Sequence, residues 1–290
     1  MKFFFLILFS SSPAFGAACC GGGFASPSLI AGDDAGQLTA SYSYTSITDD
    51  VTPDSLWHRR ASRESTVTYR LEGAHIFADR WQVGASLPFV SRARGGDSRF
   101  GLGDSSATLG YEALPDWDYS AWRPKGIAFL QLTVPTGRSA NESTALYQLD
   151  SRGRGFWALG VGSLFTKAIG AWDTFVSLEG HRSFAKDFSL GRLHPGFGGT
   201  AGAGGGFNFS SLRLGAGLAW TYEDPVDVSG SASTSGAPQR FASATASVSY
   251  LASPEWAATA SYLDQRLFGS PVNTTLGRGG TLVVQRRWQR

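Results

Sequence analysis

Few residues in this chain have the types and spacing that catalysis requires. Gly103-Asp104-Ser105-Ser106 resembles the nucleophile block of secreted hydrolases. A working site also needs a positioned histidine and an orienting carboxylate, and the four histidines lie in no recognisable partner motif. A serine assisted by His181 or His194 is the one catalytic alternative, whereas Gly-Asp before an alternating run is ordinary at the start of a strand. We therefore expect no catalytic residue and no enzymatic activity.

The sequence also lacks a pattern typical of a metal or cofactor site. The histidines are scattered and the two cysteines are the adjacent pair Cys19-Cys20, so no cluster has the spacing of a zinc site. The glycine-rich stretch 202–206 does not lead from a strand into a helix, as a phosphate-binding loop must. We expect neither a metal nor a cofactor, and we interpret these glycines as permitting close backbone approach in a strand.

Charged residues that could act on a passing solute stand at the polar positions of segments in which apolar and polar residues alternate. They are Arg70, Glu72, Glu112, Asp173, Glu179, Arg213 and Arg287. Charges that face a water-filled lumen either guide solutes or pair with one another across the lumen. The sequence favours neither interpretation, and we take the seven residues as candidates for lining the lumen and setting its selectivity.

Alternation is the main structural signal in the chain. Every second residue from Leu212 to Tyr222 is apolar, and 81–89 and 242–250 follow the same rule. A period of two indicates strands with one apolar and one polar face, and these runs match the ~9–11 residues of a tilted transmembrane strand. About twelve such segments are found, with boundaries good to a few residues. They lie near 37–47, 64–76, 80–90, 103–113, 126–135, 156–167, 172–181, 197–208, 211–222, 241–252, 255–263 and 281–288.

The connections and the composition agree with a membrane barrel. Short turns alternate with longer polar connections near 48–63, 91–102, 136–155, 182–196, 223–240 and 264–280, as in outer-membrane barrels. With 13% aromatic residues and a net charge of +2, the chain is neither disordered nor a nucleic-acid binder. After the first fifteen residues no apolar run approaches the ~18–20 residues of a spanning helix. We predict an all-β, transmembrane antiparallel barrel of about 12 strands, with short periplasmic turns, long extracellular loops and a narrow lumen lined by Gly, Ser and Thr.

Tryptophans mark the expected ends of the strands. If both termini are periplasmic, one group opens or closes strands at the periplasmic interface and the other lies at the opposite interface. The expected aromatic girdle consists of Trp81, Trp172, Trp256 and Trp288 on the periplasmic side, and Trp157 and Trp220 on the other. Amphipathic rings are typical of these two levels, whereas a soluble β-sandwich gives no reason for them to bracket strand ends.

The long connections are rich in arginine, and this predicts contact with anionic lipid. They contain Arg59, Arg60, Arg63, Arg92, Arg94, Arg99, Arg138, Arg152, Arg154, Arg182, Arg192 and Arg278. Arginine binds phosphate through two parallel hydrogen bonds, and the outer leaflet of a Gram-negative outer membrane is dense with lipid phosphates. We expect outer-membrane lipids, lipopolysaccharide included, as partners, with attraction of anionic solutes as the alternative. The sequence does not specify the oligomeric state.

The N-terminus has the features of an export signal. Lys2 precedes an apolar run over 3–10, and the small residues 16–18 offer a cleavage site, which is typical of a secretory signal peptide. We assign 1–18 to the signal peptide, 19–36 to a flexible segment and 37–290 to the barrel. Cleavage after Ala18 would leave Cys19 first, the position that carries lipid in bacterial lipoproteins, although Gly16 stands where that signal normally has leucine.

Two neighbouring motifs carry a family resemblance. The first contains Gly101-Leu102-Gly103-Asp104, and the second is a strand that ends in Pro135-Thr136-Gly137. Over 101–138 the chain resembles the outer-membrane channels named for the MetA pathway of phenol degradation. That resemblance implies a β-barrel that passes small molecules, hydrophobic or aromatic ones among them. From the residues alone, Pro135 ends strand pairing and Gly137 permits a turn. One departure is that Trp288 is followed by two further residues, whereas outer-membrane barrels usually finish on an aromatic residue.

The sequence thus predicts a passive channel for small solutes in the bacterial outer membrane. The first alternative is a structural or surface-interaction barrel whose lumen is closed by loops that fold inward, above all 136–155. The second is a lipid hydrolase embedded in the barrel.

Overall fold

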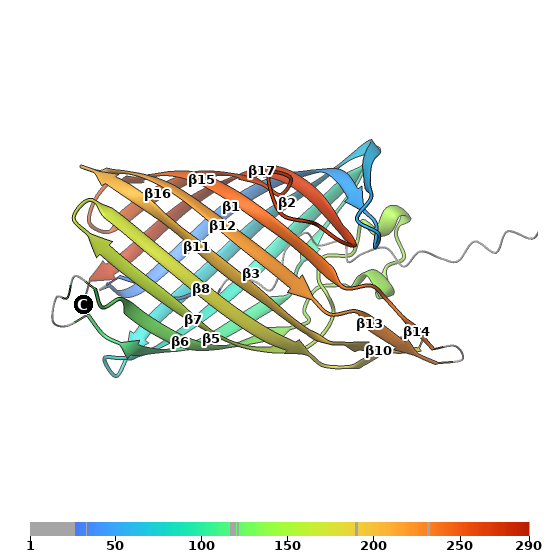
Figure 1. The fold of residues 1–290 in the computed structure, drawn as a ribbon, viewed down its shortest axis with the longest axis horizontal. Coiled ribbons are helices and arrows are strands. Elements are labelled where there is room, and N and C mark those ends of the chain that lie inside the picture. The colour runs from blue at the N-terminus through green and yellow to red at the C-terminus, as the bar shows by residue number, and fades with distance from the viewer. Residues whose placement is uncertain are drawn as a thin grey trace, which may run out of the picture.

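The chain forms one closed antiparallel β-barrel, seen in a computed structural model that describes residues 27–32, 34–116, 120, 122–188, 191–230 and 233–289 (Figure 1). Residues 1–18, predicted as a signal peptide, lie outside the described residues, and so do 19–26. Twelve strands make the barrel wall, wall strands that follow one another in the chain pair with one another, and pairing of the first, β1, with the last, β17, closes the ring. The predicted fold class is confirmed.

Each of the twelve predicted segments coincides with a strand of the wall. The wall strands are β1 (Asp34–Val51), β2 (Trp57–Phe77), β3 (Trp81–Arg94), β5 (Ser105–Leu114), β6 (Lys125–Val134), β7 (Ala158–Ile169), β8 (Trp172–Ser183), β11 (Phe197–Phe209), β12 (Leu212–Glu223), β15 (Gln239–Leu251), β16 (Trp256–Asp264) and β17 (Thr274–Gln289). The first and last strands pair along their whole length, from Asp34 opposite Gln289 to Val51 opposite Thr274.

The two faces of the wall follow the alternation in the sequence. In β12 the outward residues Leu214 and Leu218 are 59% and 55% exposed, which is high for apolar side chains. Gly215 and Gly217, which lie between them in the strand, face the lumen and are half-buried. The large apolar side chains therefore cover the outside, as in a barrel solvated by lipid. No described helix is long and apolar enough to cross a membrane.

Short turns lie at the end of the barrel that holds both ends of the wall. The β2–β3 turn has three residues between the paired Phe77 and Trp81, and it places Ala78 and Asp79 at φ values of 47° and 60°, left-handed values that are typical of tight hairpin turns. The β7–β8 turn uses Gly170 at φ 58° and the β11–β12 turn uses Ser210 at φ 53°. By the usual orientation of outer-membrane barrels this end is periplasmic.

The connections at the opposite end contain more regular structure than the sequence indicates. Strand β4 (Asp97–Leu102) forms a hairpin with β3, where we predicted a loop over 91–102. The predicted loops 182–196 and 223–240 pair with each other in a small sheet of β9 (Lys186–Phe188), β10 (Gly191–Pro195), β13 (Val226–Ser229) and β14 (Thr234–Ser235). These strands extend beyond the expected membrane zone, so they lack the apolar alternation on which the prediction depended.

The longest connection is the β6–β7 loop, residues 135–157. It carries two short 3-10 helices, η1 (Ala140–Glu142) and η2 (Leu146–Gln148), which lie at the end of the barrel away from the short turns (Figure 1). Ser139, Leu149 and Ser151 of this loop are almost completely buried, which indicates that the loop packs against the barrel.

Candidate functional site: the barrel lumen

The lumen has two unlike sides. On β3, β5 and β6 the inward side chains are buried: Gln82, Ser86, Ser106, Thr108, Glu112, Ile127, Phe129 and Gln131. On β11, β12, β15, β16, β17 and β1 most inward residues are half-exposed, and they are mainly Gly, Ser, Thr and Ala. One side of the barrel is thus covered from within, and the other presents small polar groups to the remaining space.

Glycines make room for the few large lumenal side chains. A Cβ on Gly162 would meet the ring of Phe129 at 2.4 Å, and a Cβ on Gly204 would meet the ring of Phe175 at 2.6 Å. These rings therefore lie flat against the wall instead of projecting across it. A Cβ on Gly217 would have the Phe175 ring as its nearest neighbour, at 3.5 Å, so space remains there.

Hydroxyl pairs line the half-exposed side. Ser43 and Thr281 are 2.9 Å apart, Thr259 donates to Ser249 at 2.8 Å, and Thr200 and Thr221 are 3.2 Å apart. Each pair joins neighbouring strands and keeps further lone pairs for water, so this surface can be wetted without a charge.

Residues 27–32 cover the opposite side near the periplasmic end. Ser28 donates to the carbonyl of Gly73, and Ile30 exchanges hydrogen bonds with the Gln82 side chain at 2.7 and 3.4 Å. A Cβ on Gly84 would lie 2.1 Å from the Ser28 carbonyl oxygen, so the segment fits against a glycine of the inward face. Ile30 is 1% exposed. This segment belongs to 19–36, expected as flexible, and its described part is packed inside the lumen.

The β6–β7 loop crosses the extracellular mouth of the barrel. Its contacts reach inward residues of β3, β8 and β12, which lie on different sides of the ring. Three clusters hold it to the rest of the barrel, and a fourth shapes it internally.

The first cluster clamps both ends of the loop to Asp104. The carboxylate accepts hydrogen bonds from the backbone N–H groups of Gly137 at 3.0 Å, Arg154 at 2.6 Å and Gly155 at 3.3 Å. Thr136 donates to the carbonyl of Gly103 at 2.6 Å. The Gly-Leu-Gly-Asp and Pro-Thr-Gly motifs thus meet in space and close the base of the loop.

Glycine is required on the loop side of this clamp. A Cβ on Gly153 would lie 2.2 Å from a carboxylate oxygen of Asp104, and Gly155 has a φ of +78°. A side chain at either position would push the loop off the carboxylate.

The second cluster is centred on Glu64 of β2, whose side chain is 2% exposed. Arg92 donates to it at 2.5 Å, and Arg60 forms a second ion pair with it. The same Arg92 donates to the carbonyls of Gln148 and Ser151, at 3.0 and 3.2 Å. A buried cation that is neutralised by a wall carboxylate therefore anchors the middle of the loop.

The third cluster joins the loop to the far wall. His181 of β8 lies 2.9 Å from Glu179 and 3.2 Å from Glu223 of β12, and Arg154 of the loop pairs with Glu223 at 2.8 Å. Arg154 also lies 3.3 Å from His181. The histidine is thus held between two carboxylates and one guanidinium.

The fourth cluster shapes the loop internally. Burial alone would raise the pKa of Asp150, but hydrogen bonds from Ser143, Arg138 and the N–H groups of Thr144 and Ala145 outweigh it and hold that pKa well below its usual range. In Glu142 burial is likewise outweighed, since Lys186 and Ser139 donate to the carboxylate and lower its pKa. At Asp104 burial dominates and raises the pKa above the ordinary value despite its three N–H donors.

The structure places each of the seven candidate charges in an ion pair. Arg70 and Glu72 are 3.9 Å apart, and Asp173 and Arg213 form a two-bond pair at 2.5 and 2.7 Å. The other pairs are Glu112 with Lys125 at 3.7 Å, Glu179 with His181, and Arg287 with Asp34 at 3.8 Å. Only Asp173 with Arg213 and Arg70 with Glu72 join two candidates. Lys125 also donates to the carbonyl of Gly32, in the lumenal N-terminal segment.

The six girdle tryptophans lie on the outside of the wall. Trp81, Trp172 and Trp256 begin β3, β8 and β16, and Trp288 lies near the end of β17, all at the short-turn end. Trp157 immediately precedes β7 and Trp220 lies near the end of β12, both at the other end. All six are between 40% and 62% exposed.

The two histidines of the catalytic alternative have different partners, and neither is paired with Ser105. Ser105 pairs with the hydroxyl of Thr136 at 2.9 Å, and His181 is held by Glu179 and Glu223. His194 lies 3.0 Å from the hydroxyl of Ser229, in an exposed contact within the small sheet outside the wall. Among the described residues no group of His, Cys, Asp and Glu could hold a metal ion.

Sequence reasoning missed the residues that hold the loop: Glu64, Asp104 in this role, Arg154 and His181. The two spaced motifs were visible, but their contact depends on the register of β5 with β6, in which Ser105 lies opposite Val134. The alternation of arginine and glycine over 152–155 was the only other feature of the sequence that marked the loop end held by Asp104.

Comparison with solved structures supports the fold. The COG4313 outer membrane channel from Pseudomonas putida F1 superimposes with a TM-score of 0.74 at 16% identity, over 90% of this chain and 98% of that one. This match confirms, at the level of the fold, the resemblance to outer-membrane channels predicted from the sequence.

Other outer-membrane barrels superimpose less well. The NanC porin gives a TM-score of 0.48 at 7% identity, over 86% of this chain and 98% of that one. The translocator domain of the autotransporter NalP from Neisseria meningitidis gives 0.46 at 13% identity, over 88% of each chain. No protein-family profile and no curated protein matches the sequence.

Proposed function

We propose that this protein is an outer-membrane channel for passive diffusion of small solutes, and that it reaches the membrane through a cleaved signal peptide. One observation carries the proposal: the inward face of β11, β12, β15, β16, β17 and β1 is lined by small residues that are half-exposed. A wall of glycine, serine and threonine leaves space and offers hydrogen bonds to water. Twelve strands also stand between the eight of a barrel that side chains fill and the sixteen of one with an aqueous channel.

The solute path in this proposal runs along the small-residue side, past the Asp173–Arg213 pair. The side chains of Asp173 and Arg213 are 27% and 29% exposed, so the pair contacts the lumenal water and sets a local selectivity for charge. Hydrophobic and aromatic molecules are included among the solutes because most inward residues of this side are small and uncharged, and the ring of Phe175 lies against Gly204 and Gly217 there.

The β6–β7 loop acts as the gate of this channel. Its docking across the mouth also favours the alternative of a closed, structural barrel, because three clusters hold it in place. The two functions differ in whether the loop leaves a path when docked.

Single-channel recording in planar bilayers tests the proposal. The refolded protein is expected to give discrete openings, and a variant with the loop shortened between Arg138 and Arg152 is expected to give larger ones. If the full-length protein is silent and the shortened variant conducts, the barrel is closed by its loop. If both are silent, the channel function is wrong.

A further inference from the structure

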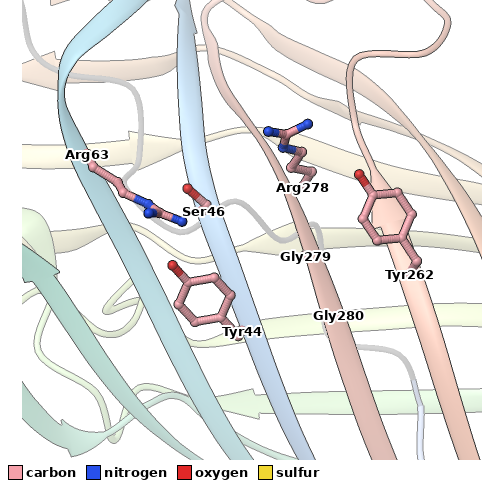
Figure 2. Close-up of a pocket in the computed structure, with 7 residues that line it drawn as sticks. All are labelled: Tyr44, Ser46, Arg63, Tyr262, Arg278, Gly279 and Gly280. Atoms are coloured by element: carbon pink, nitrogen blue, oxygen red, sulfur yellow. The ribbon is translucent and has the colours of Figure 1, made fainter.

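A groove lies on the outer face of the wall, away from the lumen. Tyr44, Ser46, Arg63, Tyr262, Arg278, Gly279 and Gly280 line it, and its volume is about 390 Å³ (Figure 2). Tyr44, Tyr262 and Arg278 lie in the outward phase of β1, β16 and β17, so the groove opens toward whatever surrounds the barrel. It lies near the ends of these strands that join the long connections, which is the extracellular side in the usual orientation of such barrels.

Strand register explains the hollow. Gly280 lies opposite Tyr44 on one side and Tyr262 on the other, so a residue without a side chain separates two tyrosines in one row. In the next outward-facing row toward the long connections, Arg278 lies opposite Ser46, another small residue. The hollow is therefore built into the pairing of three strands, with aromatic walls and a glycine floor.

Two guanidinium groups converge on the groove without a protein partner. Figure 2 shows the Arg63 side chain directed from β2 across β1 toward Ser46, with Arg278 on the other side. Within the part of the chain that the structure describes, neither side chain makes an ion pair or a hydrogen bond. The nearest carboxylate in the strand register, Asp264 opposite Arg278, is occupied by Arg266, which binds it through its backbone N–H at 2.8 Å and its guanidinium at 3.4 Å.

Arg63 and Arg278 differ from the arginines that serve the barrel interior and its loops. Arg60, Arg92, Arg154, Arg213 and Arg266 are each matched with a carboxylate. Two arginines that face the membrane zone beside tyrosine hydroxyls, with no counter-charge from the described part of the chain, have the complementarity of a site for a phosphate. Both tyrosine rings can stack on a sugar, and Tyr44 can also donate to it, whereas the Tyr262 hydroxyl donates to Asp264 at 3.5 Å. The level of the two tyrosines on the barrel is that of an outer interface.

We propose that this groove binds the phosphorylated headgroup of an outer-leaflet glycolipid. The phosphate lies between Arg63 and Arg278, and the sugar that carries it rests on Gly280 between Tyr44 and Tyr262. A lipid is favoured over a free anion because the groove is on the lipid-facing side and opens away from the lumen. The site is independent of whether the lumen conducts.

Native mass spectrometry of the detergent-solubilised protein tests this site, with lipid A that carries two phosphates as the probe. Wild-type protein is expected to bind it in a defined complex, and Arg63→Gln and Arg278→Gln are each expected to weaken binding about tenfold, since each removes a charge-assisted contact. Gly280→Val fills the groove without a change of charge. A Cβ on Gly280 would lie 3.6 Å from the nearest atom, so the strand tolerates the substitution while binding falls.

Arg59→Gln is the matched control, because it removes an exposed arginine of the same strand outside the groove. Heat-dependent mobility on gels checks that every variant forms the barrel. Lipid A without phosphates is expected to bind at least tenfold more weakly to wild-type protein, since it lacks the charge-assisted contacts. Inorganic phosphate alone is expected not to compete when present in large excess.

Three results overturn the proposal: equal binding of wild type and the Arg63→Gln/Arg278→Gln double variant, equal binding of lipid A with and without phosphates, or full competition by inorganic phosphate. The first would show that the arginines are not used, the second that the groove is an apolar lipid site, and the third that the ligand is a free anion.

Discussion

Replacing Asp104 by alanine is expected to release the β6–β7 loop from the mouth of the barrel. The carboxylate accepts three backbone N–H groups, from Gly137, Arg154 and Gly155, and these belong to the two ends of the loop. Without the carboxylate, the three N–H groups must either stay buried without an acceptor or move into water. Each hydrogen bond to a charged group contributes about 1.5 kcal/mol, and burial of the carboxylate, which raises its pKa, offsets part of that gain. A net loss of about 3 kcal/mol is expected, which corresponds to roughly a hundredfold shift from docked to undocked loop.

Limited trypsin digestion of the folded protein and single-channel recording measure this shift. Cleavage after Arg152 and Arg154 is expected to accelerate by one to two orders of magnitude in Asp104→Ala, as the open population rises, and channel openings are expected to grow longer or larger. Asp97→Ala is the control, since Asp97 is an exposed residue of the neighbouring hairpin. Unchanged cleavage and unchanged openings in Asp104→Ala would refute the account of the clamp.

Three further outcomes follow from the lumen and the loop. Because the pKa of Asp150 is lowered, the ionised carboxylate stabilises the docked loop above the ordinary carboxyl pKa of about 4, and this stabilisation is lost as the pH falls through the lowered pKa. Hydrogen exchange in 139–150 should therefore rise only in strong acid. Asp150→Asn should raise the same exchange at neutral pH. The leucine side chain in Gly217→Leu would project into open lumenal space, so this variant should fold normally and show a lower conductance. In Gly162→Ala the new Cβ would meet the Leu178 carbonyl and the Phe129 ring at 2.4 Å, so this variant should instead give a lower yield of heat-modifiable barrel. Arg213→Gln leaves Asp173 without its counter-charge, although Asn208 still donates to it at 2.8 Å, so reversal potentials in a salt gradient should shift toward cation selectivity. The stability loss should be only about 1 kcal/mol because the pair is partly exposed. An unchanged reversal potential would show that the pair lies off the path.

The wall of the barrel could be predicted from the sequence because lipid makes the pattern strict. A strand such as β12 must place Leu212, Leu214 and Leu218 on one face and glycines on the other, and a one-residue shift would expose the wrong face. The predicted segment with the least side-chain signal, near 197–208, is also a wall strand. A side chain on its glycines would meet neighbouring backbone atoms and rings, as at Gly204. In this strand, close packing of the backbone therefore takes the place of alternating apolar and polar side chains.

The interior could not be predicted, because its contacts join residues far apart in the chain. Glu64 and Arg92 have no local pattern that marks them, yet their pair supports Gln148 and Ser151 of the loop. Likewise the N-terminal segment, which we assigned as flexible, contacts the inward face of β3 through Ile30. The candidate charges share the polar phase of their strands, but their partners depend on the three-dimensional arrangement, as with Lys125 for Glu112.

The most direct test of the proposed path uses single cysteines in a variant that lacks Cys19 and Cys20. Thr245 and Ser247 lie on the small-residue side of the lumen, Ala246 between them faces outward, and Gln131 is buried on the covered side. A membrane-impermeant, charged thiol reagent added during single-channel recording should reduce the conductance of Ser247→Cys and leave Ala246→Cys and Gln131→Cys unchanged. No channel openings before the reagent, or no effect at Ser247→Cys with a block at Gln131→Cys, would contradict a solute path along this wall.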